Sequence, residues 1–598
     1  MKNEDKVFAM RHSLAHIMAA AVSHLYENVK FGVGPSVENG FYYDIDFGET
    51  KITDADLKKI DKEMRRIIGQ KIEIVRSEMP IDDAVKWAKK AGQSYKTELL
   101  NDLKNRGTTA VAGDDIAENG VDEVSFYTID DFVDLCRGPH VANTGAVGAF
   151  KLIRISGAYW RGDEKNPMMQ RIYGAAFTTK EELNEYLVRM EEAKKRDHRR
   201  LGKELDLFTF SDLVGAGLPM FTPRGTVLRD EFAKYSVELR QKAGFQLVWT
   251  PHITKIDLYK KSGHYAKFGE GFMVEGQVSH DSFMMKPMNC PHHTQIFASK
   301  PRTYRELPIR YMEVTTDYRD EKTGELGGLS RVRSLTQDDS HVFCRHDQIE
   351  QEFKQIVAIT QELYENIGMK LRARLSYRDD SDQYLGDAKL WEKSQKQIRK
   401  VADSNGLDYF EAEGEAAFYG PKIDFMALDA LGREFQVSTV QLDFVQPERF
   451  GLEYIDDSGA AVCPVMIHYA TLGSIERFLS IFIEHTAGKF PVWCAPEQLR
   501  LILVKNDDKN LTKFARDIYS QIKAAGIRVE LDESNESVGK KIRNCENMKV
   551  PYAVVLGEKE VMGQKLPLRV RADLGGPEEL TLSKLLEKII DESKTRAR

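Results

Sequence analysis

Apolar and polar residues over the first part of the chain follow a helical pattern in some stretches and a strand pattern in others. Residues 6–27 carry apolar residues at helical spacing, whereas residues 32–47 alternate apolar and polar residues and are rich in glycine and aromatics. Helical patterns return at residues 52–70 and 80–91. The Gly- and Asp-rich segment 101–124 predicts a surface loop. Residues 1–178 are therefore expected to form an α+β domain.

Residues 179–205 have the pattern of a charged linker helix. The segment opens with Thr179 and has Glu182 three residues later, which is a signature of a helix N-terminus. Its basic run, KKRDHRR, could contact phosphates, but a charge run more often forms a solvated face. We favour the solvated face.

Beyond the linker, the pattern predicts two more domains, at residues 206–494 and 495–598. The first contains a turn, a long helix and a strand at 217–253, two strands around a loop at 311–344, and a short strand that turns into a helix at 465–483. The second alternates strands with helices, which predicts an α/β domain with a partly parallel sheet.

Composition agrees with a multidomain protein and bears on its cellular location, the state of its cysteines and its partners. The chain has 598 residues, of which 42% are hydrophobic and 30% charged. No apolar run approaches the roughly 20 residues that span a bilayer, and no signal peptide begins the sequence, so we expect a cytoplasmic protein with no membrane contact. The six cysteines show no paired spacing, which fits free thiols. The net charge of −7 does not decide whether the partner is a nucleic acid.

Three scattered residues, Cys290, His341 and His468, offer the chemistry of a catalytic metal site. A thiolate and two imidazoles can hold zinc tetrahedrally and leave one position open. The ligands lie 51 and 127 residues apart, and at that spacing one buried cysteine and two unrelated histidines would be the ordinary interpretation. The sequence around each residue argues against it.

The segments KPMNCP, TQDDSHVFC and PVMIHYATLGSIERF around these three residues together resemble the catalytic core of the threonyl-tRNA synthetases, which are class II aminoacyl-tRNA synthetases. The resemblance implies an antiparallel-sheet catalytic core over 206–494 and one Zn²⁺ per subunit. Residues 217–253, 311–344 and 465–483 resemble motifs 1, 2 and 3 of that class. Motif 1 forms the dimer interface in such enzymes, so a homodimer is expected.

The same resemblance implies roles for the arginines of motifs 2 and 3. Arg319, paired with Glu321, would contact the ATP α-phosphate, Arg331 would be a second phosphate contact, and Arg477 would stack on adenine. Mg²⁺ would accompany the ATP. No P-loop or Rossmann fingerprint is present, which leaves the phosphates to these arginines. For any single arginine, a surface salt bridge is the commoner fate.

Further residues would line the amino-acid pocket by the same resemblance. Gln337 and Asp339 alternate with His341, which puts all three on one face of a strand. The remaining pocket residues are Tyr419, Lys422, Gln436, Thr439 and Gln441. The sequence departs from the common family pattern at Leu335, His292, Gly327 and Tyr469, none of which is a predicted ligand. Leu335, in place of an aromatic residue, would weaken ATP binding slightly.

A second constellation lies in the first domain. His12 and His16 share one helix face, but Ser13 stands where a metalloprotease would need glutamate, so that activity is excluded. Taken alone, this segment favours two partly buried histidines. With DLCRGPH at 134–140, however, it resembles the editing domain of bacterial threonyl-tRNA synthetases. The resemblance implies a cleft that hydrolyses seryl-tRNA, whose metal content is left open, and which is formed by His12, His16, Lys96, Asp134, Cys136 and His140.

Residues 495–598 resemble the anticodon-binding domain shared by threonyl-, prolyl-, histidyl- and glycyl-tRNA synthetases. Glu560 and Arg569 match residues that read the threonine anticodon, although an ordinary charged hairpin is the alternative. Most bacterial members begin with a small extra N-terminal domain, whereas this sequence starts at the helix that carries His12.

The resemblance thus predicts an enzyme that uses ATP, L-threonine and tRNA(Thr). Two alternatives stay open at this point. A prolyl- or seryl-tRNA synthetase is disfavoured by the paired HSLAH and CRGPH motifs and by the three metal ligands. A non-catalytic RNA-binding regulator with the same fold is disfavoured because Arg319, Arg331 and Arg477 are all present.

Overall fold

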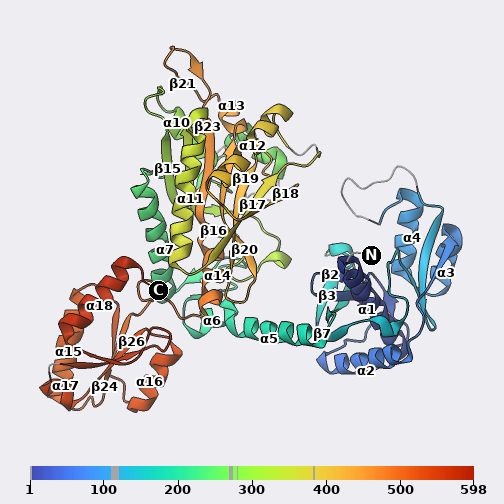
Figure 1. Cartoon of the computed structure of the whole chain (residues 1–598), viewed down its shortest axis with the longest axis horizontal. Helices are drawn as coiled ribbons and strands as arrows, with labels where there is room; N and C mark the ends of the chain where they lie inside the picture. The colour runs from blue at the N-terminus through green and yellow to red at the C-terminus, as the bar shows by residue number, and fades with distance from the viewer. Residues whose placement is uncertain are drawn as a thin grey trace. The chain divides into compact units, whose positions relative to one another are not determined.

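The computed structural model describes residues 3–109, 120–163, 165–268, 274–278, 281–381, 384–563 and 565–597. The chain forms two compact units, Met1–Glu191 and Glu192–Arg598 (Figure 1). Each unit has hydrophobic cores of its own.

The first unit is built around helix α1 (Asn3–Leu25), which confirms the helix predicted at 6–27. Most of its small and apolar residues, from Ala9 to Val22, are fully buried, since α2 (Asp54–Gln70) covers one side and a five-stranded sheet covers another. The sheet consists of β1 (Lys30–Phe31), β2 (Ser36–Val37), β3 (Gly40–Asp46), β7 (Ala149–Tyr159) and β8 (Met168–Phe177). A helix buried on several sides needs no polar face, which explains its weak amphipathic pattern.

A smaller three-stranded sheet completes this unit. It contains β4 (Val75–Pro80), β5 (Glu123–Ile129) and β6 (Phe132–Leu135), and α3 (Ile81–Lys90) and α4 (Ser94–Arg106) accompany it. The loop predicted at 101–124 is wrong at both ends, because residues 101–106 complete α4 and bury Leu103, and Glu123 and Val124 begin β5. Residues 110–119 of that prediction lie outside the described part of the chain.

The predicted linker helix is two helices, α5 (Lys180–Arg196) and α6 (His198–Glu204). They separate at Asp197, whose side chain accepts a hydrogen bond from the Arg199 N–H and caps α6. The solvated face expected for KKRDHRR is also wrong in part, because His198 and Leu201 are buried against the second unit's core, whereas Arg199 and Arg200 stay exposed.

The second unit contains an eight-stranded sheet in the order β11-β15-β16-β23-β20-β19-β17-β18. Its central strands pair antiparallel, and only the outer pairs β11–β15 and β17–β18 are parallel. The strands are β11 (Gln246–Leu247), β15 (Ile309–Tyr318), β16 (Ser334–Cys344), β17 (Lys370–Tyr377), β18 (Tyr409–Glu413), β19 (Lys422–Leu428), β20 (Glu434–Asp443) and β23 (Val465–Ser474). This arrangement confirms the predicted antiparallel-sheet core.

Besides the short α6, four longer helices contribute to the core of this sheet: α7 (Pro223–Lys242), α11 (Ile349–Asn366), α12 (Ala388–Ser404) and α14 (Ile475–Thr486). Local sequence fixes where α7 and α14 begin. Thr222 caps α7 ahead of Pro223, and the Ser474 side chain accepts the Arg477 N–H at the start of α14. The predicted helix of 217–253 and strand–helix of 465–483 are thereby confirmed, although β23 is longer than expected.

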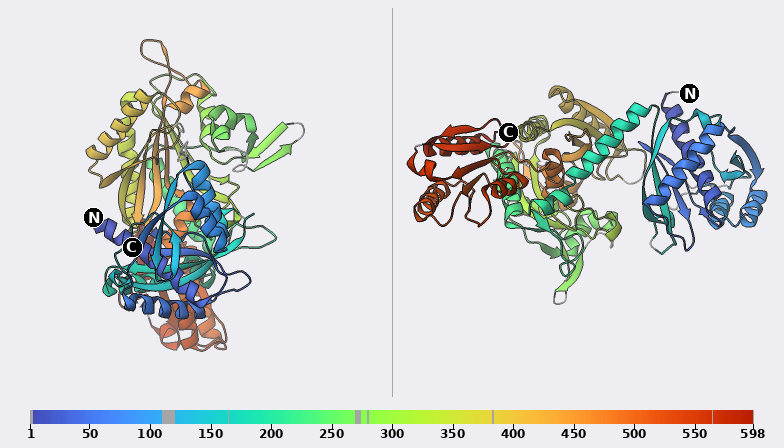
Figure 2. Two further views of the ribbon diagram at one scale, coloured as in Figure 1. Left: turned by 90° about the vertical axis from the view of Figure 1, so that its right-hand side faces the viewer. Right: turned by 90° about the horizontal axis from the view of Figure 1, so that it is seen from below.

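Shorter elements flank the large sheet. They are β9 (Phe208–Thr209), β10 (Met220–Phe221), β12 (Ile253–Lys255), β13 (Glu275–Val278), β14 (Asp281–Met285), β21 (Tyr454–Ile455), β22 (Ala461–Val462), α8 (Ile256–Ser262), α9 (His264–Phe268), α10 (Cys290–Ala298) and α13 (Val445–Phe450). Figure 2 shows the β13–β14 hairpin projecting beside α8 and α9.

The C-terminal part of the second unit has a five-stranded sheet in the order β25-β24-β26-β27-β28. Its strands and helices are β24 (Leu499–Leu503), α15 (Lys509–Ala524), β25 (Val529–Asp532), α16 (Val538–Asn547), β26 (Tyr552–Leu556), α17 (Glu558–Met562), β27 (Leu566–Val570), β28 (Glu578–Leu580) and α18 (Leu582–Thr595). The first three strands are parallel and the last two antiparallel, which confirms a partly parallel sheet. Among the described helices of the whole chain, none is long and apolar enough to cross a membrane.

Candidate active site

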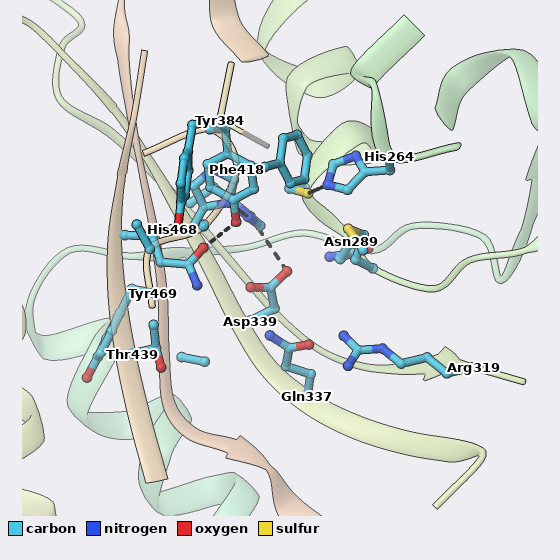
Figure 3. A pocket seen from close by; sticks show the side chains of 18 residues that line it. His264, Asn289, Arg319, Gln337, Asp339, Tyr384, Phe418, Thr439, His468 and Tyr469 are labelled. Atoms are coloured by element: carbon cyan, nitrogen blue, oxygen red, sulfur yellow. Dashed lines mark hydrogen bonds and ion pairs between the residues drawn. The ribbon is translucent and has the colours of Figure 1, made fainter. Parts of the chain in front are cut away.

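A cavity of about 400 Å³ lies over one face of the eight-stranded sheet (Figure 3). Its floor comes from three neighbouring strands in register: His341 of β16 lies opposite His468 of β23, which lies opposite Gln441 of β20. Because side chains alternate along a strand, Asp339 and Thr439, two residues away, point to the same face. Sheet register thus gathers side chains that are far apart in the sequence.

The three predicted metal ligands meet in this cavity. The ligand atoms of Cys290, His341 and His468 all lie within 4.8 Å of one another, and all three residues are buried. His341 Nε2 lies 3.1 Å from His468 Nδ1. Tetrahedral zinc with bonds of about 2.0–2.3 Å needs ligand atoms roughly 3.3–3.7 Å apart. The donor set and its spacing therefore fit zinc after small adjustments.

Neighbouring polar groups fix which atom of each histidine faces the other ligands. His293 Nδ1 lies 2.8 Å from His341 Nδ1, and Asp443 accepts a 2.8 Å hydrogen bond from His468 Nε2. These contacts leave His341 Nε2 and His468 Nδ1 facing the common centre. Such partners set the orientation of metal-binding histidines. The sequence prediction missed both partners, although the histidine pair of NCPHH and the aspartate of QLDF were visible signals.

The residues predicted to line the amino-acid pocket lie around the same cavity with two exceptions. Asp339 is buried, and burial together with the nearby carboxylates of Asp317 and Asp338 raises its pKa well above the usual range. A positively charged or hydrogen-bond-donating group beside Asp339 would offset this effect and favour the carboxylate form. In Figure 3, the guanidinium group of Arg319 points toward the Gln337 side chain. The other lining residues predicted from sequence are Gln337, Tyr419, Thr439 and Gln441.

Lys422 and Gln436 are the exceptions, since neither is among the residues that line the cavity. The Lys422 ammonium group lies 2.9 Å from Asp424, a fully buried carboxylate that the sequence prediction missed. Asp424 also accepts hydrogen bonds from Gln436, at 2.7 Å, and Thr439, at 2.9 Å. Asp424 therefore holds the side chains of Gln436 and Thr439 in place by hydrogen bonds, and Lys422 pairs with the same carboxylate.

A second cavity of about 480 Å³ shares Arg319, Gln337 and Thr439 with the first. It collects the predicted arginines, because Arg331 and Arg477 also line it. The remaining lining residues predicted from sequence are Glu321, Leu335, Gln436 and Gln441. The exposed Arg331 lies 2.7 Å from Glu321 and 2.9 Å from Glu325, which are weak surface pairs that an anionic ligand can displace. Three guanidinium groups around one cavity suit a polyphosphate.

Asp317, near Arg319, is a buried carboxylate whose oxygens have no hydrogen-bond partner among the described residues. Burial raises its pKa to about 7, against the opposing effect of Arg319 and Lys286. The folded protein thus keeps a proton that the unfolded chain releases near pH 4, so stability falls as pH rises from about 4 to 7.

We expect Asp317→Asn to stabilise the protein above pH 7, because the amide avoids the buried charge. The free energy of unfolding should rise by at most about 4 kcal/mol, since each unit of pKa shift corresponds to about 1.36 kcal/mol. This increase should shrink toward zero near pH 4. Urea unfolding at pH 8 and pH 5 measures it, with Asp320→Asn, an exposed neighbour, as the control. An equal effect of Asp317→Asn at both pH values would contradict this explanation.

The first unit holds a separate cavity of about 630 Å³, lined by His12, His16, Lys96, Asp134 and Cys136. Cys136 Sγ lies 3.3 Å from His12 Nε2 and 3.3 Å from His140 Nε2. The Lys96 ammonium group lies 2.5 Å from Asp134. The structure thus brings together all six predicted residues of this cleft. Prediction missed Tyr43, which donates to Asp134, and Ser13, whose hydroxyl lies 3.0 Å from His140 Nδ1.

Burial sets the protonation of this cleft. It lowers the pKa of His140 to about 2 and that of His16 well below the usual range, so both imidazoles are neutral near pH 7. Burial raises the pKa of Cys136 to about 11, which keeps the sulfur as a thiol. A thiol is a poor nucleophile, so the cleft favours positioned water over covalent catalysis by cysteine.

Glu560 and Arg569 belong to the C-terminal sheet region and not to a simple hairpin. Glu560 lies in α17, where its carboxylate accepts the Gly557 N–H at 2.8 Å. Arg569 lies on β27 with its side chain about half exposed, 3.9 Å from Glu546.

Comparison with known families accounts for three parts of the chain. Residues 272–486 match the tRNA synthetase class II core domain (G, H, P, S and T), and residues 498–592 match an anticodon binding domain. Residues 124–173 match the threonyl and alanyl tRNA synthetase second additional domain.

Whole-chain relatives agree with these matches. The chain is 47% identical over 579 residues to a threonine–tRNA ligase of Gloeobacter violaceus, which covers 95% of this chain and 89% of that protein. It is 46% identical over 563 residues to a threonine–tRNA ligase of Geobacillus kaustophilus. That match covers 94% of this chain and 84% of the Geobacillus protein. Among solved structures, the RNA binding domain of threonyl-tRNA synthetase from Cryptosporidium parvum matches with a TM-score of 0.63 and 35% identity, over 66% of this chain and 98% of that one.

Proposed function

Because the chain belongs to the threonyl-tRNA synthetase family of class II aminoacyl-tRNA synthetases, we propose that it activates L-threonine with ATP and transfers it to the 3′ end of tRNA(Thr). The observation that carries this proposal is the pair of adjoining cavities. One holds Cys290, His341 and His468, and the other collects three arginines. ATP–pyrophosphate exchange with each amino acid tests it. Threonine should support the fastest exchange, and exchange with proline alone would contradict the proposal.

Activation requires in-line attack of the threonine carboxylate on the ATP α-phosphate, so charge neutralisation and alignment are the protein's tasks. We assign Arg319 to the α-phosphate, since it lines both cavities and therefore lies where the two substrates meet. Arg477 would stack on adenine, and Arg331 would contact phosphate after leaving Glu321 and Glu325. Mg²⁺ accompanies the ATP. Asp339 would accept a hydrogen bond from the substrate amino group, and Gln337 would bind its carboxylate.

We propose one Zn²⁺ per chain, held by Cys290, His341 and His468. The bound ion would take up the amino and hydroxyl groups of threonine and so distinguish it from valine, which an apolar pocket separates by only about a hundredfold. Serine also carries a hydroxyl group, and the missing methyl supplies only roughly 1–3 kcal/mol of discrimination. A second, hydrolytic site is therefore needed.

We assign that hydrolysis to the cleft of the first unit, acting on seryl-tRNA(Thr). His12 and His16 would orient a water molecule and the tRNA 3′ ribose, since the lowered pKa of each imidazole keeps it neutral and able to accept a hydrogen bond. Cys136 and His140 would hold the seryl group, with Lys96 and Asp134 beside them. The mechanism needs no metal in this cleft.

A His12→Ala, His16→Ala double variant is expected to charge threonine at a near-normal rate but to accumulate Ser-tRNA(Thr). Loss of the residues that position water should slow deacylation by about a hundredfold or more. Deacylation of preformed Ser-tRNA(Thr) measures the effect. His24→Ala, on the same helix but outside the cleft, is the control. If the unmodified protein accumulates Ser-tRNA(Thr) equally, the cleft does not edit.

We propose that residues 1–178 form the editing domain, 179–205 the linker, 206–494 the catalytic domain and 495–598 the anticodon-binding domain.

Within the proposed anticodon-binding domain, Glu560→Ala or Arg569→Ala should raise KM for tRNA(Thr) about tenfold, because lost base contacts weaken recognition. Pyrophosphate exchange should be unchanged. The exposed Glu579→Ala is the control. Equal loss of exchange and charging would indicate misfolding instead of lost recognition.

We also propose a homodimer formed through the motif 1 segment, 217–253. Trp249 is 76% exposed, Leu247 55% and Ile253 48%, so this short stretch presents three large apolar side chains to solvent. Sedimentation velocity measures the assembly, and a fully active monomer would count against the dimer.

A further inference from the structure

His198, the first residue of α6, connects three parts of the second unit that are distant in sequence. Its Nδ1 lies 2.7 Å from Glu484 Oε1, on α14, and its backbone N–H donates to the same oxygen at 3.1 Å. On the other side of the ring, Nε2 accepts a 3.1 Å hydrogen bond from the Leu329 N–H. Leu329 belongs to the loop 319–333 between β15 and β16.

These contacts require one form of the imidazole. Nδ1 must carry the proton, because its partner is a carboxylate that can only accept. Nε2 must then be bare, because its partner is a backbone N–H that can only donate. Only the neutral ring protonated on Nδ1 satisfies both neighbours. His198 is buried, so an unmatched nitrogen or an unbonded Leu329 N–H would carry the full penalty of a buried polar group.

The loop approaches this ring closely. At Gly328, φ is +56°, and a Cβ atom there would lie 2.3 Å from His198 Nε2. The side chain of Leu329 is fully buried in the core, which anchors the loop beside the contact. Other hydrogen bonds close the loop on itself: Gly327 N–H donates to Arg331 O at 3.2 Å, and Arg319 N–H donates to Arg333 O at 2.9 Å. Because these bonds link the loop residues to one another, the contact at Leu329 constrains the position of the whole loop.

Both elements that His198 joins carry arginines of the second cavity. The loop carries Arg319 and Arg331, and α14 carries Arg477 two turns before Glu484. Arg433 holds the other oxygen of Glu484 at 2.6 Å, so the carboxylate is fixed from both sides. One imidazole thus contacts both the loop that carries two of these arginines and the helix that carries the third.

We propose that His198 is a positioning residue for adenylate formation, which holds the 319–333 loop at the spacing from α14 that ATP requires. This inference rests on the proposed roles of Arg319, Arg331 and Arg477. Because α6 ends the linker, it also makes the last residues of the linker part of the catalytic apparatus.

Two matched variants separate positioning from packing. In His198→Asn, the amide nitrogen takes the place of Nδ1 and can still donate to Glu484, but nothing reaches the Leu329 N–H. In His198→Gln, the amide oxygen takes the place of Nε2 and can still accept from Leu329. We expect His198→Asn to raise KM for ATP about tenfold in pyrophosphate exchange, the effect of losing one buried hydrogen bond. His198→Gln should stay close to the unmodified protein.

The thermal unfolding temperature of both variants is measured alongside. If the two variants lose stability alike and their KM values move together, His198 acts only in packing, and the proposal is overturned. An unchanged KM for ATP in folded His198→Asn also overturns it. A His198→Asn, Arg331→Ala double variant tests whether His198 acts through Arg331. If it does, His198→Asn should raise KM for ATP by a smaller factor when Arg331 is already absent. Failure of the unmodified protein to exchange pyrophosphate with threonine would instead refute the proposed function.

Discussion

Replacing Arg319 with alanine is expected to abolish threonyl-adenylate formation while leaving the fold intact. The transition state of phosphoryl attack concentrates negative charge at the α-phosphate, and a preorganised guanidinium group stabilises it without reorganisation. Removing a single preorganised donor of this kind typically costs about 10²–10³ in rate, and a charged donor at the reacting phosphate belongs at the upper end. Arg319 is the one proposed phosphate contact that lines both cavities.

ATP–pyrophosphate exchange measures this loss directly, because it reports activation without tRNA. Circular dichroism and thermal unfolding show whether the variant folds. Arg305→Ala removes an exposed arginine that lines neither cavity and should leave exchange unchanged. A variant of Arg319 that keeps full exchange and loses only tRNA binding would contradict the assignment.

Cys290→Ser is expected to lose both the metal and threonine activation. The three ligand atoms converge from α10, β16 and β23, and a serine hydroxyl is a far poorer zinc ligand than a thiolate. Without the proposed ion, the pocket would lose the group to which we assign the distinction between threonine and valine. Metal analysis of the purified protein should give one zinc per chain before the change and much less than one after it.

The exposed Cys463→Ser is the matched control, since it removes another thiol close to β23 without touching the cavity. Asp443→Asn offers a graded test. It keeps all three ligands but weakens the orientation of His468, and such changes typically lower metal affinity about 10–100-fold. A Cys290→Ser protein with full zinc content and full threonine activation would refute the proposed site.

The family, the fold class and the activity were predictable from sequence, because short motifs carry them. KPMNCP, TQDDSH and SIERF each combine a reactive residue with its local structure, and the comparisons confirm the family that they indicate. The start of a helix was also predictable where a cap was visible, as at Thr179, whose hydroxyl accepts the Glu182 N–H at 3.2 Å just before α5 begins. Capping depends on residues three or four positions apart, which a sequence pattern contains in full.

Local periodicity in the sequence thus determined most of the helices and strands, and the family resemblance indicated most of the residues that line the cavity. Tertiary structure alone decided the supporting contacts. His293, Asp443 and Asp424 were missed, Lys422 proved to support Asp424 instead of lining the cavity, and His198 proved to be buried. In most of these contacts the partners lie tens to hundreds of residues apart and meet through strand register or helix packing. A periodic pattern states which face of an element is apolar, but the identity of the neighbour across that face depends on how the whole chain packs.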